Sequence, residues 1–366
     1  MGSAGPFLYI LGKLTHNLMD VYDQTTRTNN TFRYLSQKRI YMNRERIKTH
    51  LNRSIHEFPD IQIIPPGSLT SGETASAMIS LLQSVYVNHG IANNREAVKK
   101  DLESGSLRTW LAKSDGEFVA TASLVKQTNG DVELGRAVSR KKGAGKILMA
   151  SAAISHIESD RPKPIVAEVR VADEFWGVPN SFATQHLCFE LFDLIPHAIA
   201  PFFSHGSPLR NESFVLARSD RTDRRTVSEL AREPLNNRNM NGSPIGLTII
   251  QTKPFKIVVP KENGRSLDPL SLEEDFMWKE GFTLFPIETT DRNLPLIGSL
   301  LSNPRMVLCG IDHFLGKNDK PIVFIGTIGA DTKMANTKIT EAISQPMRRD
   351  LQTIADKFVS LGNQKK

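Results

Sequence analysis

A short run of glycine and basic residues lies between an expected strand and an expected helix, and its residue types suit a phosphorylated ligand. The run reads Arg140-Lys141-Lys142-Gly143-Ala144-Gly145-Lys146. A helix N-terminus exposes backbone N–H groups and the positive end of the helix dipole, and both attract a phosphate. Glycine lets the backbone approach a pyrophosphate without an intervening Cβ, and the basic side chains add positive charge. The sequence therefore predicts a pyrophosphate-binding loop here.

Two widespread phosphate-binding motifs do not fit this run. It lacks the Gly-x-x-x-x-Gly-Lys-Ser/Thr pattern of P-loops and the Gly-x-Gly-x-x-Gly pattern of dinucleotide-binding folds. The pattern that remains resembles the acyl-CoA signature of the GNAT superfamily of N-acyltransferases, Gln/Arg-x-x-Gly-x-Gly/Ala, and matches it at Arg140, Gly143 and Gly145. The resemblance implies binding of acetyl-CoA or another acyl-CoA. A glycine turn with a purely structural role is the alternative interpretation.

The elements expected around the loop extend the resemblance over residues 61 to 203. Apolar spacing and turn signals predict, in order, helices at 71–87 and 95–102, strands at 109–112, 118–125 and 132–138, a helix at 143–157, a strand at 164–171 and a helix at 181–194. The Asp115-Gly116 pair predicts a hairpin between the first two of these strands. This order is that of the GNAT superfamily, which implies an α/β fold with a mixed sheet flanked by helices.

The resemblance also implies which residues meet the cofactor. In that superfamily the strand before the loop offers backbone groups to the pantetheine arm, which implicates Leu134, Arg136 and Val138. The next strand, 166–171, is expected to splay away and open the cofactor cleft. Asn180 corresponds to a polar residue at the edge of that cleft.

The family's chemistry needs a base that takes a proton from the amine. Glu133, on the strand before the loop, is the candidate base, acting directly or through water. Glu168, on the neighbouring strand, is the second choice. A surface glutamate that pairs with Arg170 or Arg136 is the alternative interpretation for either residue.

An acid is also needed to protonate the leaving thiolate. The final helix of the family often carries a tyrosine in this role, but residues 181–194 contain none and offer Cys188 and His186 instead. Leucine and phenylalanine residues surround Cys188, which favours a position in the core. The chain could therefore release the thiolate to water, or bind the cofactor without catalysis.

The N-terminal part of the chain is strongly basic. Between positions 27 and 53 only Glu45 opposes a series of Lys and Arg residues, and Phe32, Tyr34 and Tyr41 lie among them. This pattern permits an alternative function, an RNA-binding protein or a transferase with an RNA-borne acyl donor. The preferred interpretation is a helical face that packs its aromatic residues on the body. With a helix expected at 7–22, residues 1–60 are predicted to form a helical, basic extension.

The remainder of the chain is predicted to contain a linker and a second domain. Residues 204–243 are rich in Arg, Asn, Asp, Ser and Gly, which indicates a linker or long loop with at most one short helix. Strands expected at 246–252, 255–259, 306–311 and 322–328 and a closing helix at 339–361 predict an α+β domain over 244–366. A degenerate copy of the first domain is another hypothesis for residues 244–366. However, no Arg or Gln precedes residues 326–330 at the distance that the Gln/Arg-x-x-Gly-x-Gly/Ala pattern requires. An accessory or dimerising domain, giving a homodimer, is preferred.

Composition sets the remaining expectations. The 366 residues are 39% hydrophobic and 23% charged with a formal net charge of +7, which fits an ordinary globular protein of two domains. No apolar run approaches the roughly 20 residues of a membrane span, and no signal peptide is visible. The two cysteines are expected to be buried thiols, and no spacing suggests a metal site. We therefore expect a cytoplasmic acyltransferase, acetyl-CoA-dependent by default, whose acceptor is a primary amine of a small molecule or amino acid.

Overall fold

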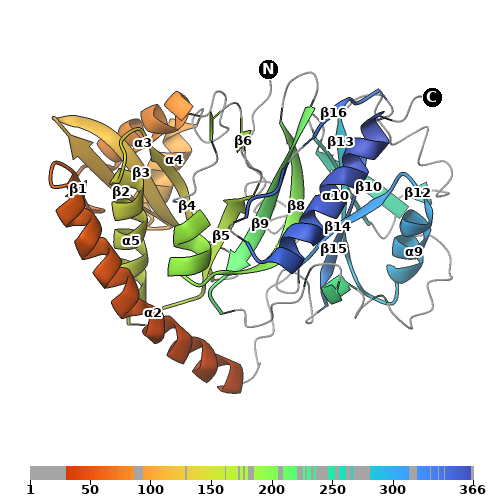
Figure 1. Cartoon of the computed structure of the whole chain (residues 1–366), viewed down its shortest axis with the longest axis horizontal. Helices are drawn as coiled ribbons and strands as arrows, with labels where there is room; N and C mark the ends of the chain where they lie inside the picture. Colours follow the sequence, from red (N-terminus) through yellow and green to blue (C-terminus); the bar gives the residue numbers. More distant parts are fainter. Residues whose placement is uncertain are drawn as a thin grey trace.

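The computed structural model describes residues 30–85, 94–127, 130–160, 162–171, 174–175, 178–179, 185–204, 209–220, 226, 229–231, 235, 246–251, 255–260, 265–266, 281–312, 320–329, 331–336, 338–341 and 343–363. The helix expected at 7–22 and the side chain of Asn180 lie outside these residues. Two large β-sheets stand side by side, with helices packed on them, and β6 (Glu174–Phe175) and β7 (Val178–Pro179) form a separate antiparallel pair (Figure 1). None of the described helices combines the length and the apolar character that a membrane crossing requires.

The first sheet carries the predicted loop. Its strands are β1 (Gln62–Ile64), β2 (Leu107–Ser114), β3 (Glu117–Lys126), β4 (Val132–Ser139), β5 (Ile165–Arg170), β8 (Ile195–Ser204), β9 (Leu209–Arg218) and β16 (Met334–Ala335). They follow the order β1-β2-β3-β4-β5-β9-β16, and β8 also pairs with β9. Neighbours run antiparallel except β4 with β5 and β9 with β16. The mixed sheet flanked by helices that the sequence predicted is confirmed.

Helices cover both faces of this sheet, because the strands alternate their side chains between two cores. Leu107, Leu111 and Val138 pack under α3 (Ser71–Val85) and α4 (Arg95–Glu103). Leu124 and Leu134 face the other way, in the core that contains α5 (Ala144–Ile157). The long helix α2 (Asn30–Glu57) lies along α5, and Ile47 on α2 is 1% exposed.

The β2–β3 hairpin forms where the sequence predicted it. Asp115 and Gly116 have φ angles of +53° and +82°. Two consecutive residues with positive φ match the right-handed twist of the flanking strands, which is the reason Asp-Gly is favoured in such turns.

The sheet splits between β4 and β5. These strands pair in parallel only through Val132 with Ile165 and Glu133 with Val166. Beyond Glu133, β4 continues beside β3 while β5 continues beside β9. The splay that the resemblance implied for residues 166–171 is therefore present.

An ion-pair network closes the sheet where β4 and β5 still touch. The Arg218 guanidinium, at the end of β9, donates to Asp131 Oδ2 (2.5 Å), just before β4, and to Asp220 Oδ1 (2.9 Å). Its side chain is only 7% exposed. Buried charges of this kind are tolerated only with close counter-ions and full hydrogen bonding, so the network fixes the closed end of the split.

Two predictions differ from the structure. Residues 209–218, placed by the sequence in a linker, form β9 between β5 and β8, so the first sheet extends past the predicted boundary at 203. Polar residues fill positions 210–213 near the start of the strand, which explains why its pattern resembles that of a loop. Residues 181–184 of the helix predicted at 181–194 lie outside the described residues, and His186–Leu191 form a π-helix, η2, in which the Phe192 N–H donates to Leu187 O.

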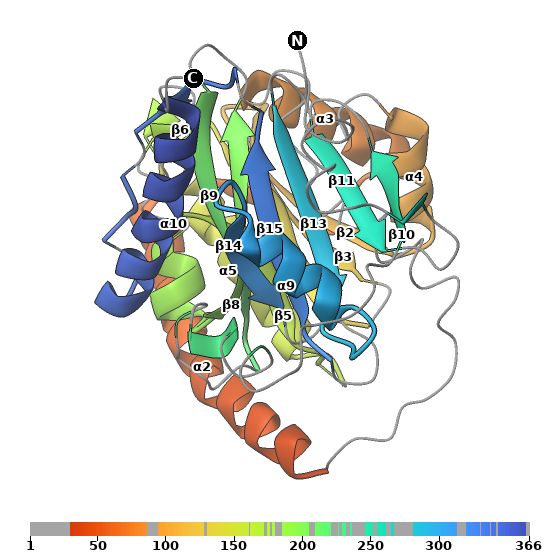
Figure 2. The same ribbon diagram turned by 90° about the vertical axis from the view of Figure 1, so that its right-hand side faces the viewer.

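The second sheet is built from residues after 245. Its strands are β10 (Gly246–Gln251), β11 (Phe255–Pro260), β12 (Arg265–Ser266), β13 (Phe282–Glu288), β14 (Val307–Asp312) and β15 (Ile322–Ile328), in the order β12-β10-β11-β13-β15-β14. Helix α9 (Leu294–Ser302) lies in front of this sheet in Figure 2, with α10 (Gln345–Asn363) beside it.

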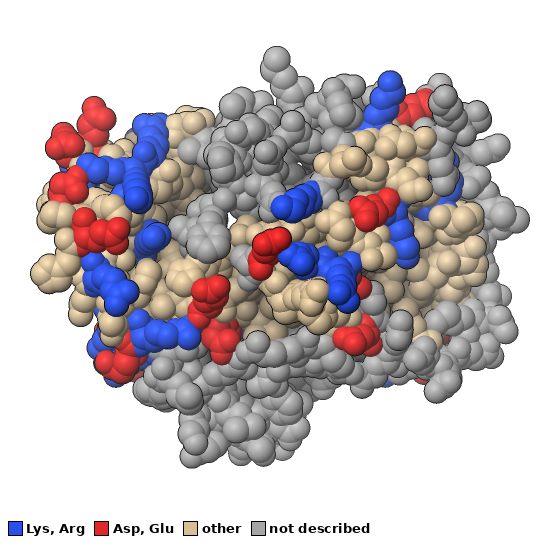
Figure 3. All heavy atoms as spheres, in the orientation of Figure 1, with Lys and Arg blue, Asp and Glu red and all other residues tan. Residues whose placement is uncertain are grey.

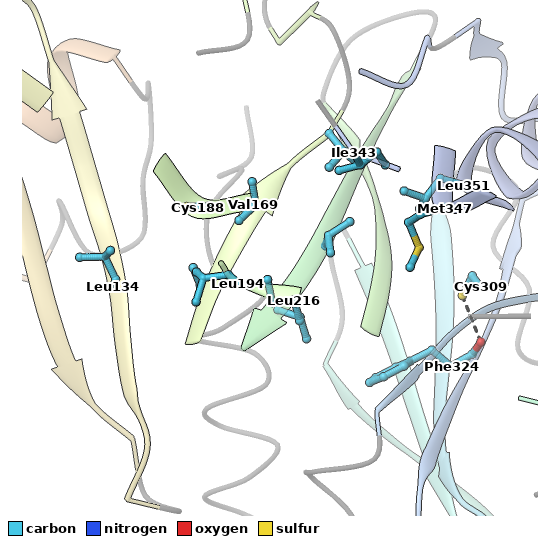
Figure 4. Packing of buried hydrophobic residues seen from close by; sticks show 14 of the residues in the cluster. Leu134, Val169, Cys188, Leu194, Leu216, Cys309, Phe324, Ile343, Met347 and Leu351 are labelled. Carbon is cyan, nitrogen blue, oxygen red and sulfur yellow. Dashed lines mark hydrogen bonds between the residues drawn. The ribbon is translucent and has the colours of Figure 1, made fainter. Parts of the chain in front are cut away.

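The two sheets share one core. β8 of the first sheet contacts β14 of the second, and α10 contacts strands of both. Figure 4 shows this continuity, from Leu134 and Leu216 on the first sheet to Met347 and Leu351 on α10. The Cys309 thiol donates to the Phe324 carbonyl (3.2 Å) inside it. The halves therefore support each other rather than standing apart.

We predict that Arg218→Ala lowers the free energy of unfolding by about 3–5 kcal/mol, because Asp131 and Asp220 lose their buried counter-ion. Urea denaturation measures this. The matched control is Lys99→Ala, which breaks an exposed pair with Glu103 (3.9 Å) and should change stability by less than about 0.5 kcal/mol. Equal effects of the two substitutions would contradict a special role for the Arg218 network.

Candidate active site

The predicted loop joins the end of β4 to the first turn of α5. The Ile147 N–H donates to Gly143 O (3.1 Å) and the Ala144 N–H to Lys141 O (3.3 Å), so the helix begins directly at the loop. The first N–H groups of a helix have no acceptor inside it. Gly145 and Lys146 therefore present theirs at this end, where the helix dipole also favours an anion.

Gly143 is required by the fold itself. Its φ angle is +87°, and a Cβ built there would overlap the ring of Phe58, which follows α2. Gly145 is less restricted, because an added Cβ would lie 3.2 Å from Ser139 Cβ. Gly143 therefore has a structural role, which does not conflict with an anion at the neighbouring N–H groups.

Lys141 braces the loop instead of pointing to solvent. Its Nζ donates to Asp60 Oδ2 and to Ser114 Oγ (2.6 Å), and Asp115 lies 3.8 Å away. The hydrogen bond with Asp60 raises the pKa of Lys141. The ammonium group therefore already has a counter-ion, and only the backbone of Lys141 remains suited to a ligand.

Arg140 is similarly engaged. Its Nε donates to Ser84 Oγ (2.7 Å) on α3. Lys142 is exposed and Lys146 is half-buried. Of the four basic side chains predicted to meet an anion, the structure leaves Lys142 and Lys146 as the best placed.

A β-bulge distorts β4 beside the split. Ser123 pairs with Gly135 and Thr121 with Val138, so β4 has one more residue than β3 over this stretch. Arg136 lies in the bulge with φ +50°, a region that non-glycine residues rarely adopt. Bulges unpair backbone groups and re-aim side chains. The backbone of residues 134–138, predicted to contact the cofactor, therefore lines the gap between β4 and β5.

The two candidate bases face the same side of the sheet. Glu133 lies opposite Val125, on the face that α3 and α4 cover. On β5, Ala167 and Val169 pack toward the α5 core, which turns Glu168 to the same side as Glu133. The loop belongs to the helix on the opposite face. A ligand held by the loop and an acceptor beside Glu133 would thus lie on opposite faces of the sheet, on either side of the parted strands β4 and β5.

Glu133 is held in place by its neighbours. Gln127 Nε2 donates to Glu133 Oε2 (2.6 Å). A Cβ on Gly135 would stand 2.6 Å from Glu133 Oε1, so the glycine makes room for the carboxylate. Burial raises the pKa of Glu133, against the opposing effects of Arg136 and the Gln127 hydrogen bond.

The two candidates for the general acid, Cys188 and His186, differ in their exposure to solvent. Cys188 is 1% exposed within the core, and burial raises its pKa to about 12. These observations argue against the acid role that the sequence left open for Cys188. His186, on the same short helix, keeps part of its ring exposed and has its Nδ1 at 2.5 Å from Glu190 Oε2.

The basic extension is partly used in packing. Arg44 and Lys48 on α2 both pair with Glu158 beyond the end of α5 (2.8 and 2.7 Å). On the face shown in Figure 3, described acidic and basic side chains are interspersed. The RNA-binding alternative stays a prediction. In the described part of the chain, no group of His, Cys, Asp and Glu could hold a metal ion.

Comparison with known proteins gives structural likenesses. No family model and no curated protein sequence matches the chain. Its structure is similar to that of a GNAT-family acetyltransferase from Streptococcus pneumoniae (13% identity, TM-score 0.33). The match spans 43% of this chain and 98% of the acetyltransferase chain. It is also similar to an acyl-CoA N-acyltransferase from Pseudomonas aeruginosa (17%, 0.28) and to Escherichia coli ElaA (20%, 0.30), each covering 43% of this chain and 97% of its own. Function does not follow from likeness at this level.

We predict that Gly143→Ala destabilises the protein by about 2–4 kcal/mol, the sum of a left-handed backbone and a clash with Phe58. Gly145→Ala should change the free energy of unfolding by less than about 1 kcal/mol, because its Cβ meets only a tight contact. In the background of Phe58→Ala, the clash part of the Gly143→Ala effect should disappear. A Gly143→Ala variant with unchanged stability in urea denaturation would show that the glycine is not needed by the fold.

Proposed function

We propose that the first sheet and α5 form the active site of an acyl-CoA-dependent N-acyltransferase that acts on a primary amine, with acetyl as the default acyl group. One observation carries the proposal. β4 and β5 part after Glu133, and the chain leaving β4 immediately forms a glycine-containing loop at a helix N-terminus. A gap beside an anion site suits a long ligand with a pyrophosphate at one end.

The residues fit such a ligand. The N–H groups of Gly145 and Lys146 suit a pyrophosphate, with Lys142 at the surface of the loop. The edge of β4 that faces the gap can hydrogen-bond the amide groups of a pantetheine arm. Bound there, acyl-CoA would supply an activated thioester carbonyl. Because Phe58 and Asp60 brace the loop in advance, little ordering is left for the moment of binding.

Glu133 would remove the proton of the attacking amine. Its carboxylate lies on the face opposite the loop, and its raised pKa makes it a stronger base than an ordinary glutamate. With Cys188 buried, the departing thiolate would take its proton from water or from His186, whose ring is oriented by Glu190.

Isothermal titration with CoA and acetyl-CoA tests cofactor binding. We expect Lys142→Glu to weaken binding about tenfold, because it reverses a charge near the pyrophosphate. Lys163→Glu is the matched control, since it makes the same change of net charge near the other end of α5 and should leave affinity unchanged. Absence of binding by the unaltered protein would refute the proposed function.

The pH dependence of kcat/KM tests whether Glu133 is the base. A base works in its deprotonated form, so kcat/KM should fall as the pH is lowered through the raised pKa of Glu133, above the ordinary glutamate range. Glu133→Gln should remove that part of the profile and slow the reaction by about 10²–10⁴-fold. Glu117→Gln, on the exposed start of β3, should retain the profile. An unchanged profile in Glu133→Gln would assign the base elsewhere.

A further inference from the structure

Arg136, in the β4 bulge, carries a buried guanidinium nitrogen that has no partner. Its Nη1 is shielded from solvent and has no hydrogen-bond partner. Buried N–H groups without a partner are rare in native proteins and call for a specific explanation. The backbone of the same residue is strained at φ +50°, and strain of this kind clusters at ligand sites. Two independent features therefore single out one position in the β4 bulge.

The acids nearby do not bond this nitrogen. Glu133 and Asp101 favour the charged form of Arg136 through space and oppose the lowering of its pKa by burial. The Glu133 carboxylate accepts from Gln127, and the Asp101 carboxylate accepts from Ser106 Oγ (3.5 Å). Arg136 keeps some accessible surface. A guanidinium binds carboxylates through two parallel hydrogen bonds, and the unpartnered Nη1 has a donor left for such a bond.

We propose that Arg136 binds a carboxylate of the acceptor, so that the acceptor is an amino acid or another amine that carries a carboxylate. This inference rests on the proposed function. Glu133 and Arg136 are close in sequence around Gly135, which places a base and a carboxylate receptor side by side. That pairing suits a molecule whose amine and carboxylate are themselves close together.

The atoms and protons of the acyl transfer balance with these groups. The amine nitrogen bonds to the acyl carbon, the bond from that carbon to sulfur breaks, and the amine proton passes to the Glu133 carboxylate. The thiolate takes a proton from water or His186. The products are an N-acyl amino acid and free CoA.

Matched substrate pairs test this inference. Each pair is an amino acid and its decarboxylated amine, such as phenylalanine with phenethylamine and lysine with cadaverine. We expect kcat/KM to favour the amino acid by at least about tenfold, mainly through KM. Arg136→Asn should bring the ratio of kcat/KM for the amino acid to kcat/KM for its amine close to one, whatever its effect on the rate common to both, and asparagine tolerates the positive φ. Arg136→Gln gives a second variant of closer size.

The outcomes are distinct. A preference for the decarboxylated amines, or an equal loss on both members of a pair in both variants, would overturn the role of Arg136. Acyl-CoA binding with no acceptance of carboxylate-bearing amines would overturn it as well. Titration of the same proteins with acetyl-CoA separates this result from failure of the proposed function, which would abolish cofactor binding itself.

The second sheet repeats the connectivity of the first sheet from β3 onward. β10 and β11 form a hairpin as β3 and β4 do, β13 is parallel to β11, and β15 lies between β13 and β14 as β9 lies between β5 and β8. The helices η2 and α9 occupy the same position in each half. Even the bulges correspond: each follows the second residue of its strand, at Pro196–Ala198 in β8 and Leu308–Gly310 in β14.

The halves differ in the sequence that follows β4 and β11. The chain after β4 carries the Arg-x-x-Gly-x-Gly pattern, whereas the chain after β11 reads Lys261-Glu262-Asn263-Gly264-Arg265-Ser266 and lacks it. Arg265 and Ser266 pair with β10. The two halves meet through the corresponding strands β8 and β14. An isologous contact between two identical copies would juxtapose corresponding elements in the same way.

We infer that the C-terminal half is a degenerate duplicate of the first, which takes the place of a partner copy and holds no cofactor of its own. It also completes the first half, because β16 adds to β9 and the Thr340 N–H donates to Val171 O (2.7 Å) at the end of β5. The hypothesis of a degenerate copy is thus preferred over an independent dimerising domain.

Light scattering and titration test the duplicate. We expect a monomer near 40.8 kDa, because the edge strand β8 is already covered within the chain. Titration with CoA should give one site per chain. A stable dimer or two equivalent sites would overturn the inference. The mass measurement tests whether the chain is a monomer even if CoA does not bind. The proposed function and the duplication can therefore fail separately.

Discussion

The separation of β4 from β5 is the constraint on which the candidate site depends. A continuous sheet would pair every backbone group of β4 and leave no passage between its two faces. Here pairing stops after two residue pairs, and the buried Arg218 network with Asp131 keeps the strands together at that end only. The bulge at Arg136 lies in the part of β4 that no longer pairs with β5. The parted strands thus lie between the face that carries α5 and the face that carries Glu133.

The loop after β4 shows that one residue can satisfy a structural and a functional requirement together. Gly143 is needed because Phe58 occupies the space beside its Cα, and the same tight packing presents the next N–H groups at the helix end. The Lys141 ammonium group forms an ion pair with Asp60, and this contact fixes the loop. A preformed anion site needs such internal contacts, since a loop ordered only by its ligand would lose affinity to the cost of ordering.

The C-terminal half contributes to the first half at specific places. β16 extends the first sheet, and Thr340 bonds both the end of β5 and Gln185 (2.9 Å), which itself donates to Arg170 O. These contacts tie β5 and η2 to a distant part of the chain. The position of β5, and with it the width of the gap, therefore depends on packing between the halves and not on the first sheet alone.

The sequence by itself determined the local features. Apolar spacing located α3, α4 and α5, Asp115-Gly116 located a hairpin, and the glycine pattern located the loop at the start of α5, because each depends on neighbouring residues. Only the tertiary structure decided the rest. β9 and β13 were missed, since polar residues open the first and Pro286 interrupts the second, and pairing on both sides stabilises them. The burial of Cys188, the engagement of Lys141 and Arg140, and the repeated sheet depend on residues far apart in the chain, which local patterns cannot encode.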